Sequence, residues 1–205
     1  SMMAEMLSQL NLSSGMNVLE IGAGTGYNAA LMQTIVGQQG RVTTIELDND
    51  TAAQAEENLY RAGINGVHIV PADGAAGYAP RAAYDRILST AAVWDIPPAW
   101  VRQLKPRGRI VAPLQIHAAQ VSASLTPQPD GSLLSTHNVP CRFVLMRGIA
   151  AVPPLMRQVG SSQLTLWSLD ADKLDTASLS LLLSQDDEVN HLSAAPTAAD
   201  IWAGL

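Results

Sequence analysis

A glycine-rich segment lies between an apolar run and an amphipathic run near the start of the chain. It reads Glu20-Ile21-Gly22-Ala23-Gly24-Thr25-Gly26-Tyr27, with a glycine at every second position from Gly22 to Gly26. Glycines at a strand-to-helix connection allow a tight turn and let a ligand approach the main chain at the helix N-terminus. The spacing G-x-G-x-G differs from the dinucleotide pattern G-x-G-x-x-G. On its own, the segment is also compatible with an ordinary tight turn.

Two acidic residues follow at the ends of later strand-like runs. Glu46 ends the second run, 20 residues after Gly26, and Asp73-Gly74 follows the third. A carboxylate at the first position can accept both hydroxyl hydrogens of a ribose, and Asp73 could accept from the exocyclic amine of adenine. Together with the glycines, these residues predict an adenosine-containing ligand and do not require a pyrophosphate.

The elements that must position these residues alternate regularly. Apolar and β-branched runs predict strands at 17–21, 41–46, 67–70, 84–88 and 109–112. Amphipathic runs predict helices at 2–12, at 27–36, from Asn49 or Asp50 to Ala62, and from Pro97 to Leu104. This alternation predicts an α/β fold: a Rossmann-like, doubly wound and mostly parallel sheet.

The pattern changes after residue 114. Two strand-like runs, 120–126 and 141–147, flank the turn signal Pro129-Asp130-Gly131, and we expect an antiparallel hairpin that closes the sheet. Further on, residues 164–167 alternate like a strand and residues 178–183 are rich in leucine. A capping-box pattern at 197–200 predicts a last helix, and we expect the native protein to continue beyond it.

Charge separates these two regions. The chain has 205 residues and a net charge of −6. Residues 1–148 hold ten basic and eleven acidic side chains, whereas residues 149–205 hold two and seven. We therefore predict a ligand-binding domain at 1–148 and an acidic, incomplete α+β appendage at 149–205.

Composition excludes several classes of protein. The acidic balance argues against a nucleic-acid partner, and the apolar runs are too short to cross a bilayer, so no membrane partner is expected. The single cysteine, Cys141, excludes an intrachain disulfide framework and suits a cytoplasmic location. Four scattered histidines give no metal-ligand spacing, and no metal site is predicted.

Several motifs in a fixed order make the sequence recognisable. They are the run from Val18 to Gly26, Ala72-Asp73-Gly74, Tyr84-Asp85-Arg86-Ile87, Thr90-Ala91-Ala92, Ile96-Pro97 and Gln103-Leu104-Lys105-Pro106-Arg107-Gly108-Arg109. Over about residues 2–147 the chain resembles the protein-L-isoaspartate O-methyltransferase family. The glycine segment is common to Rossmann-like methyltransferases, whereas the later motifs are more specific.

The resemblance implies a site for S-adenosyl-L-methionine, with S-adenosyl-L-homocysteine as product. It assigns the cofactor to Glu20, Gly22, Gly24, Gly26, Tyr27, Glu46, Leu47, Asp73 and Gly74. It places Thr90, Ala91 and Ala92 near the transferring methyl group and the acceptor. The family's N-terminal Ser-x-Pro element, which helps to form the acceptor pocket, precedes the matched part and is expected to be absent here.

The resemblance also implies an activity: methylation of an isoaspartyl or aspartyl carboxyl group of a protein or peptide. An ionised carboxylate needs no general base at neutral pH, so the absence of a Ser/His/Asp or Cys/His arrangement is expected. Donors for that carboxylate could be main-chain N–H groups or the hydroxyls of Ser89 and Thr90. Three alternatives stay open: a small-molecule or nucleic-acid acceptor, a dedicated peptide substrate, and a cofactor-binding module of a larger protein.

Overall fold

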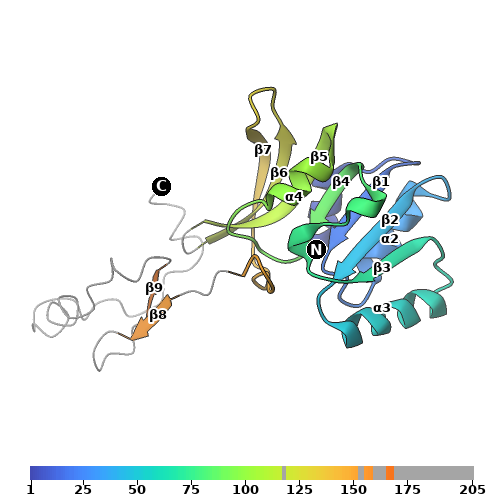
Figure 1. The fold of residues 1–205 in the computed structure, drawn as a ribbon, viewed down its shortest axis with the longest axis horizontal. Helices are drawn as coiled ribbons and strands as arrows, with labels where there is room; N and C mark the ends of the chain where they lie inside the picture. Colours follow the sequence, from blue (N-terminus) through green and yellow to red (C-terminus); the bar gives the residue numbers. More distant parts are fainter. Residues whose placement is uncertain (117–118, 152–154, 159–164, 169–205) are drawn as a thin grey trace, which may run out of the picture. The chain divides into compact units, whose positions relative to one another are not determined.

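The computed structural model of the chain describes residues 1–116, 119–151, 155–158 and 165–168 (Figure 1). The chain divides into two compact units, Ser1–Ala151 and Val152–Leu205, each of which is described by itself.

A seven-stranded sheet forms the centre of the first unit, in the order β3-β2-β1-β4-β5-β6-β7. The strands are β1 (Asn17–Ile21), β2 (Arg41–Glu46), β3 (Val67–Pro71), β4 (Tyr84–Ser89), β5 (Leu104–Ile116), β6 (Ala119–Pro127) and β7 (Leu133–Cys141). Strands β1 to β5 are parallel, and β6 and β7 add an antiparallel hairpin. The predicted α/β class and its closing hairpin are confirmed.

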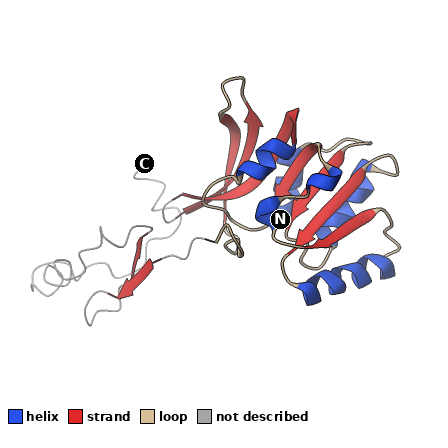
Figure 2. Cartoon of the chain, viewed as in Figure 1, coloured by secondary structure: helices blue, strands red, loops and turns tan. Residues whose placement is uncertain are grey.

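Helices precede or connect the parallel strands and lie in front of and behind the sheet (Figure 2). They are α1 (Met2–Leu10), α2 (Tyr27–Val36), α3 (Asn49–Arg61) and α4 (Pro98–Gln103), with 3₁₀ turns η1 (Gly74–Ala76) and η2 (Ala79–Arg81). From β1 the chain adds β2 and then β3 on one side, so that β3 lies at an edge of the sheet. It then returns to the other side of β1 to form β4, and the strand order therefore reverses between β1 and β4. In open α/β sheets a ligand binds at such a reversal, outside the carboxyl ends of the strands.

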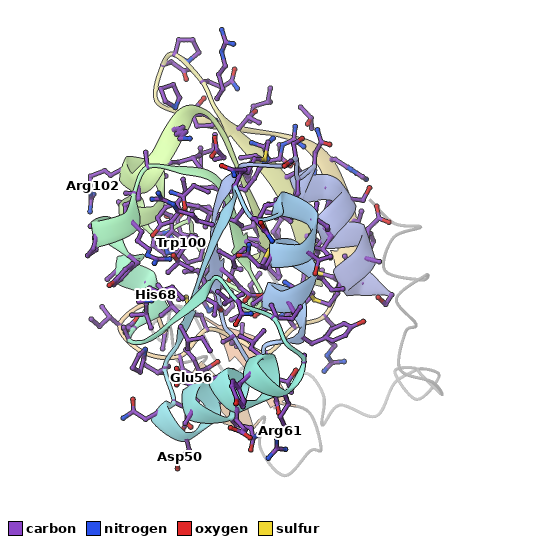
Figure 3. The ribbon with its side chains drawn as sticks, turned by 90° about the vertical axis from the view of Figure 1, so that its right-hand side faces the viewer. Asp50, Glu56, Arg61, His68, Trp100 and Arg102 are labelled. Atoms are coloured by element: carbon purple, nitrogen blue, oxygen red, sulfur yellow. The ribbon has the colours of Figure 1, made fainter. Side chains whose placement is uncertain are left out.

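Neighbouring residues of one strand pack into different layers of the core. Val18 of β1 joins a cluster with Met6 and Leu10 of α1, whereas Leu19 joins a second cluster that contains Trp100 of α4. This follows from the two-residue period of a strand, which sends successive side chains to opposite faces. Figure 3 shows Trp100 within the body of the unit, while Asp50 and Arg61 project from α3 at its surface.

Several element boundaries differ from the sequence predictions. Helix α1 ends at Leu10 and not at Leu12, because its C-cap residue Asn11 adopts a left-handed conformation. The N-cap of α3 is Asp48, not Asn49 or Asp50, because the Asp48 carboxylate accepts a hydrogen bond of 2.9 Å from the Thr51 N–H. Helix α4 ends at Gln103, one residue early, because Leu104 already pairs with Tyr84 in the sheet. Strand β5 extends far beyond the predicted 109–112 because it pairs with β4 on one side and β6 on the other.

The prediction of a strand at 141–147 is wrong. The second strand of the hairpin is β7, which begins directly after the turn and ends at Cys141. The turn is closed by a 2.9 Å hydrogen bond from the Gln128 N–H to the Ser132 carbonyl, so pairing starts at once. After β7, Leu145 forms an isolated bridge with Ala92, so the chain leaves the sheet edge and passes to the carboxyl end of the parallel strands.

In the second unit, β8 (Leu155–Gln158) and β9 (Thr165–Ser168) form an antiparallel pair. Strand β9 agrees with the predicted run at 164–167 to within one residue. The leucine-rich run at 178–183 and the capping box at 197–200 lie outside the described residues. In the described part of the chain, no helix has the length and apolar character needed to span a membrane.

Candidate functional site

A cavity of about 360 Å³ lies at the carboxyl end of the parallel strands. It is lined by Ile21, Gly22, Gly24, Ile45, Glu46, Leu47, Thr51, Gly74, Thr90, Ala91, Val144, Leu145, Met146 and Arg147. Its size falls at the lower end of the range for small-molecule and cofactor sites. Seven of the residues predicted from sequence therefore meet in one hollow: Gly22, Gly24, Glu46, Leu47, Gly74, Thr90 and Ala91.

The glycine loop leaves β1 in a conformation that favours glycine. Gly22 has φ +94° and Gly24 has φ +52°. A Cβ atom on Gly22 would collide with the Thr90 hydroxyl, whereas one on Gly24 would meet no atom within 4 Å. The first glycine thus allows close packing against the loop after β4, and the second leaves open space beside the cavity.

Glu46 joins the glycine loop to the end of β2. One carboxylate oxygen accepts from the Gly24 N–H at 3.1 Å, and the other accepts from the Asp48 N–H at 3.3 Å. The side chain is largely buried and faces the cavity. Both bonds are long for a charged acceptor, so the carboxylate retains capacity to accept hydrogen bonds from a ligand hydroxyl pair.

Glu20 lies in β1, just before the loop, and does not line the cavity. It is fully buried, and it accepts from Asn28 Nδ2 at 2.7 Å and from Thr44 Oγ1 at 2.6 Å. Burial raises the pKa of Glu20 to about 7; the two hydrogen bonds oppose the shift and the negative charge of Glu46 adds to it. In this structure Glu20 links β1 to the first turn of α2 and to β2, and direct contact with a ligand stays a prediction.

Asp73 and Gly74 follow β3 but have different surroundings. The Asp73 carboxylate accepts from the Ala75 N–H at 2.9 Å and from the Ile149 N–H at 2.7 Å, and does not line the cavity. Gly74 does line it, and its carbonyl accepts from the Trp100 indole N–H at 2.8 Å. The contact of Asp73 with an adenine amine stays a prediction.

The loop after β4 presents backbone and small side chains to the cavity. Thr90 Oγ1 donates to the carbonyl groups of Ile21 and Gly22, at 3.0 and 2.8 Å, and Ser89 Oγ donates to the Ala91 carbonyl at 2.7 Å. The two hydroxyls suggested as donors to an acceptor carboxylate are therefore bonded internally. Ala92 is buried and pairs with Leu145, behind the lining residues.

Two predicted cofactor residues lie outside this cavity. Gly26 and Tyr27 line a separate hollow of about 260 Å³ between α2 and α3. A Cβ atom on Gly26 would approach the Ala55 carbonyl oxygen to 3.1 Å, so this third glycine brings the two helices together. Their contact with the ligand remains a prediction.

Residues 144–147 form a wall of the cavity that the sequence did not predict. The incorrect prediction of a strand at 141–147 assigned these residues to the closing hairpin, which lies away from the glycine loop. The available signal was the apolar run Val144-Leu145-Met146, which precedes Arg147-Gly148 and falls after a strand that is already complete at Cys141.

These features define the class of protein. A glycine loop after β1, a carboxylate at the end of β2 and a parallel sheet extended by an antiparallel hairpin make the fold that of the Rossmann-like methyltransferases.

Comparison with known proteins identifies the family within this class. The family profile described as protein-L-isoaspartate(D-aspartate) O-methyltransferase matches residues 1–150. The chain belongs to this family.

Individual relatives are similar over the same region. A protein-L-isoaspartate O-methyltransferase of Pyrococcus horikoshii is 39% identical over 148 residues, which are 72% of this chain and 66% of the relative. One of Hyperthermus butylicus is 40% identical over 155 residues, or 72% and 64% of the two chains. A solved protein-L-isoaspartate O-methyltransferase superposes with a TM-score of 0.69 at 35% identity, covering 73% of this chain and 48% of the other. The chain thus spans less than two thirds of each of these relatives.

Proposed function

We propose that this chain binds S-adenosylmethionine and transfers its methyl group to a carboxyl group of a protein or peptide, with isoaspartyl residues as the acceptor. The observation that carries the proposal is the Glu46 carboxylate facing a cavity of about 360 Å³ beside the open backbone at Gly24. The names of the relatives point to the same acceptor and to O-methylation of it.

The residues present suit an adenosyl cofactor. Glu46 would accept from the two ribose hydroxyls, and Gly24 leaves the room that a sugar needs. Leu47, Ile21 and Met146 supply apolar surface for the rest of the ligand. The positions of Thr90 and Ala91, beyond the end of β4, suit the opposite end of the ligand, near the acceptor.

When bound, S-adenosylmethionine supplies an electrophilic methyl group to a carboxylate that is already ionised, so no general base is needed. The chain's own contribution is then alignment and exclusion of water. The Ser89 and Thr90 hydroxyls hold the loop after β4 through their bonds to Ala91, Ile21 and Gly22. They fix the shape of the acceptor end, and donors to the acceptor carboxylate must come from other groups.

The proposal includes a cytoplasmic location and a role in protein modification. Cys141 is the single cysteine of the sequence, and burial raises the pKa of its thiol to about 11. A half-buried thiol that stays protonated is unreactive, and a single free cysteine of this kind is compatible with a reducing compartment. Fractionation of cells that express the tagged protein checks the location.

The acceptor is tested by methyl transfer from labelled S-adenosylmethionine to three matched peptides. These contain isoaspartate, aspartate or asparagine at one position. We expect base-labile label in the isoaspartyl peptide alone. Label in the aspartyl peptide alone would indicate a dedicated peptide substrate, and base-stable label would exclude a methyl ester. The assay uses the complete protein as it is encoded, because the relatives extend beyond the matched region.

A further inference from the structure

Residues 143–149, which we name the crossing segment, pass over the carboxyl end of the sheet. At its start, the Phe143 N–H donates to Gln120 Oε1 at 2.6 Å. In its middle, the Ala92 N–H donates to the Val144 carbonyl and the Met146 N–H donates to the Ala92 carbonyl, both at 2.8 Å. At its end, the Ile149 N–H donates to Asp73 at 2.7 Å.

These attachments give the direction of the segment. Ala92 follows β4 and Asp73 follows β3, and in the sheet β1 and β2 lie between those strands. The crossing segment therefore runs above the ends of β1 and β2, where Glu46 and the glycine loop line the cavity. Its residues 144–147 form the wall opposite the strand ends.

Arg147 lies toward the β3 side of this wall. The residue before it, Met146, packs near Gly74, and the residue after it, Gly148, packs against the Asp73 carboxylate. Asp48, which follows β2, also lies within its electrostatic reach: the pKa of Asp48 is lowered first by hydrogen bonds from Thr51 and further by the positive charge of Arg147.

The guanidinium is available to a ligand. Arg147 is exposed and lines the cavity. Among the described residues that line this cavity, Arg147 is the one with a cationic side chain. Across the part of the chain that the structure describes, it forms neither a hydrogen bond nor an ion pair at bonding distance.

We propose that Arg147 covers the face of the adenine base and so contributes to selection of a purine nucleoside. This inference rests on the proposed function. If the ribose lies against Glu46 at the end of β2 and the reacting end lies near Thr90 after β4, the base extends to the β3 side, where Arg147 lies. A planar guanidinium stacks on aromatic rings and is attracted to their π-faces. Leu47 offers apolar surface in the same cavity.

The test is calorimetric titration with two ligands, S-adenosylhomocysteine and 5′-methylthioadenosine, which share the nucleoside and differ in the amino-acid part. The variant is Arg147→Ala. Its matched control is Arg142→Ala, which removes the same charge from an exposed position outside the cavity lining.

We expect Arg147→Ala to weaken both ligands by the same factor, about five- to tenfold, as expected for loss of a cation–π contact. We expect Arg142→Ala to bind both as the wild type does, and both variants to keep the wild-type melting temperature. A loss confined to S-adenosylhomocysteine would place Arg147 at the amino-acid end and overturn the inference. Unchanged binding of both ligands would overturn it as well. If the wild type binds neither ligand, the proposed function itself fails.

Discussion

Glu46 accepts two backbone hydrogen bonds at the edge of the cavity, from Gly24 and Asp48. We predict that Glu46→Ala weakens binding of S-adenosylhomocysteine by about 10- to 100-fold, because hydrogen bonds to a charged acceptor contribute roughly 1.5–3 kcal/mol. Calorimetry measures the change. The control is Glu56→Ala, which removes a carboxylate from the exposed face of α3 (Figure 3) and should leave binding unchanged. Equal affinity of wild type and Glu46→Ala would exclude a ribose contact.

Glu20 makes stability depend on pH. Its pKa is raised by burial from 4.5 to about 7, so between these values the folded chain holds a proton that the unfolded chain has lost. The free energy of unfolding therefore falls as the pH rises through this window, by about 3 kcal/mol once both states are ionised.

Replacement of Glu20 by Gln removes this titration. We predict that the free energy of unfolding of Glu20→Gln, measured with denaturant from pH 5 to 8, declines less steeply than that of the wild type. The exposed variant Glu56→Gln should follow the wild-type curve. Parallel curves for Glu20→Gln and the wild type would show that Glu20 does not titrate in this range.

At the scale of elements, the turn after β1 depends on contact with the loop after β4. Gly22 combines a positive φ with close packing against Thr90, whereas Gly63, with φ +68°, has no atom within 4 Å of an added Cβ. We predict that Gly22→Ala lowers the free energy of unfolding by about 2–4 kcal/mol, from strain and overpacking together. Gly63→Ala should lower it by about 1–2 kcal/mol, from the backbone conformation alone. Equal losses in denaturant unfolding would show that the Thr90 contact is unimportant.

The sequence predicts elements well where local pattern and tertiary pairing agree. The helix at 27–36 was predicted with both its bounds, since glycines flank it on each side. The hairpin was predicted only in part. Its turn is encoded locally by Pro129-Asp130-Gly131, but the second strand depends on register with β6, a non-local property. The apolar run at 144–146 looks like a strand in sequence and becomes a cavity wall because Ala92 and Asp73 hold it there.

The same limit applies to the site. The cavity positions of Gly22, Gly24 and Glu46 could be predicted because each lies at the carboxyl end of a parallel strand. Arg147 could not, since its role depends on a segment that crosses from β4 to β3. Sequence also cannot reveal that the Asp73 carboxylate is bonded to the Ile149 N–H, 76 residues away.

At the scale of the whole molecule, we propose that the first unit carries the cofactor site alone. Both core clusters and every residue of the cavity lining fall within Ser1–Ala151. We predict that a chain ending at Ala151 keeps the melting temperature of the 205-residue chain and binds S-adenosylhomocysteine within about twofold of its affinity. Differential scanning calorimetry and titration measure the two quantities. Loss of binding by a folded 1–151 chain would show that the acidic tail contributes to the site.

We propose above all that the cavity beside Glu46 holds the methyl donor. A crystal structure with S-adenosylhomocysteine tests it most directly. We predict that the ribose hydroxyls donate to Glu46, with the base on the β3 side beneath Arg147 and the sulfur toward Thr90 and Ala91. Ligand in the hollow between α2 and α3, or in this cavity with its ribose away from Glu46, would contradict the account.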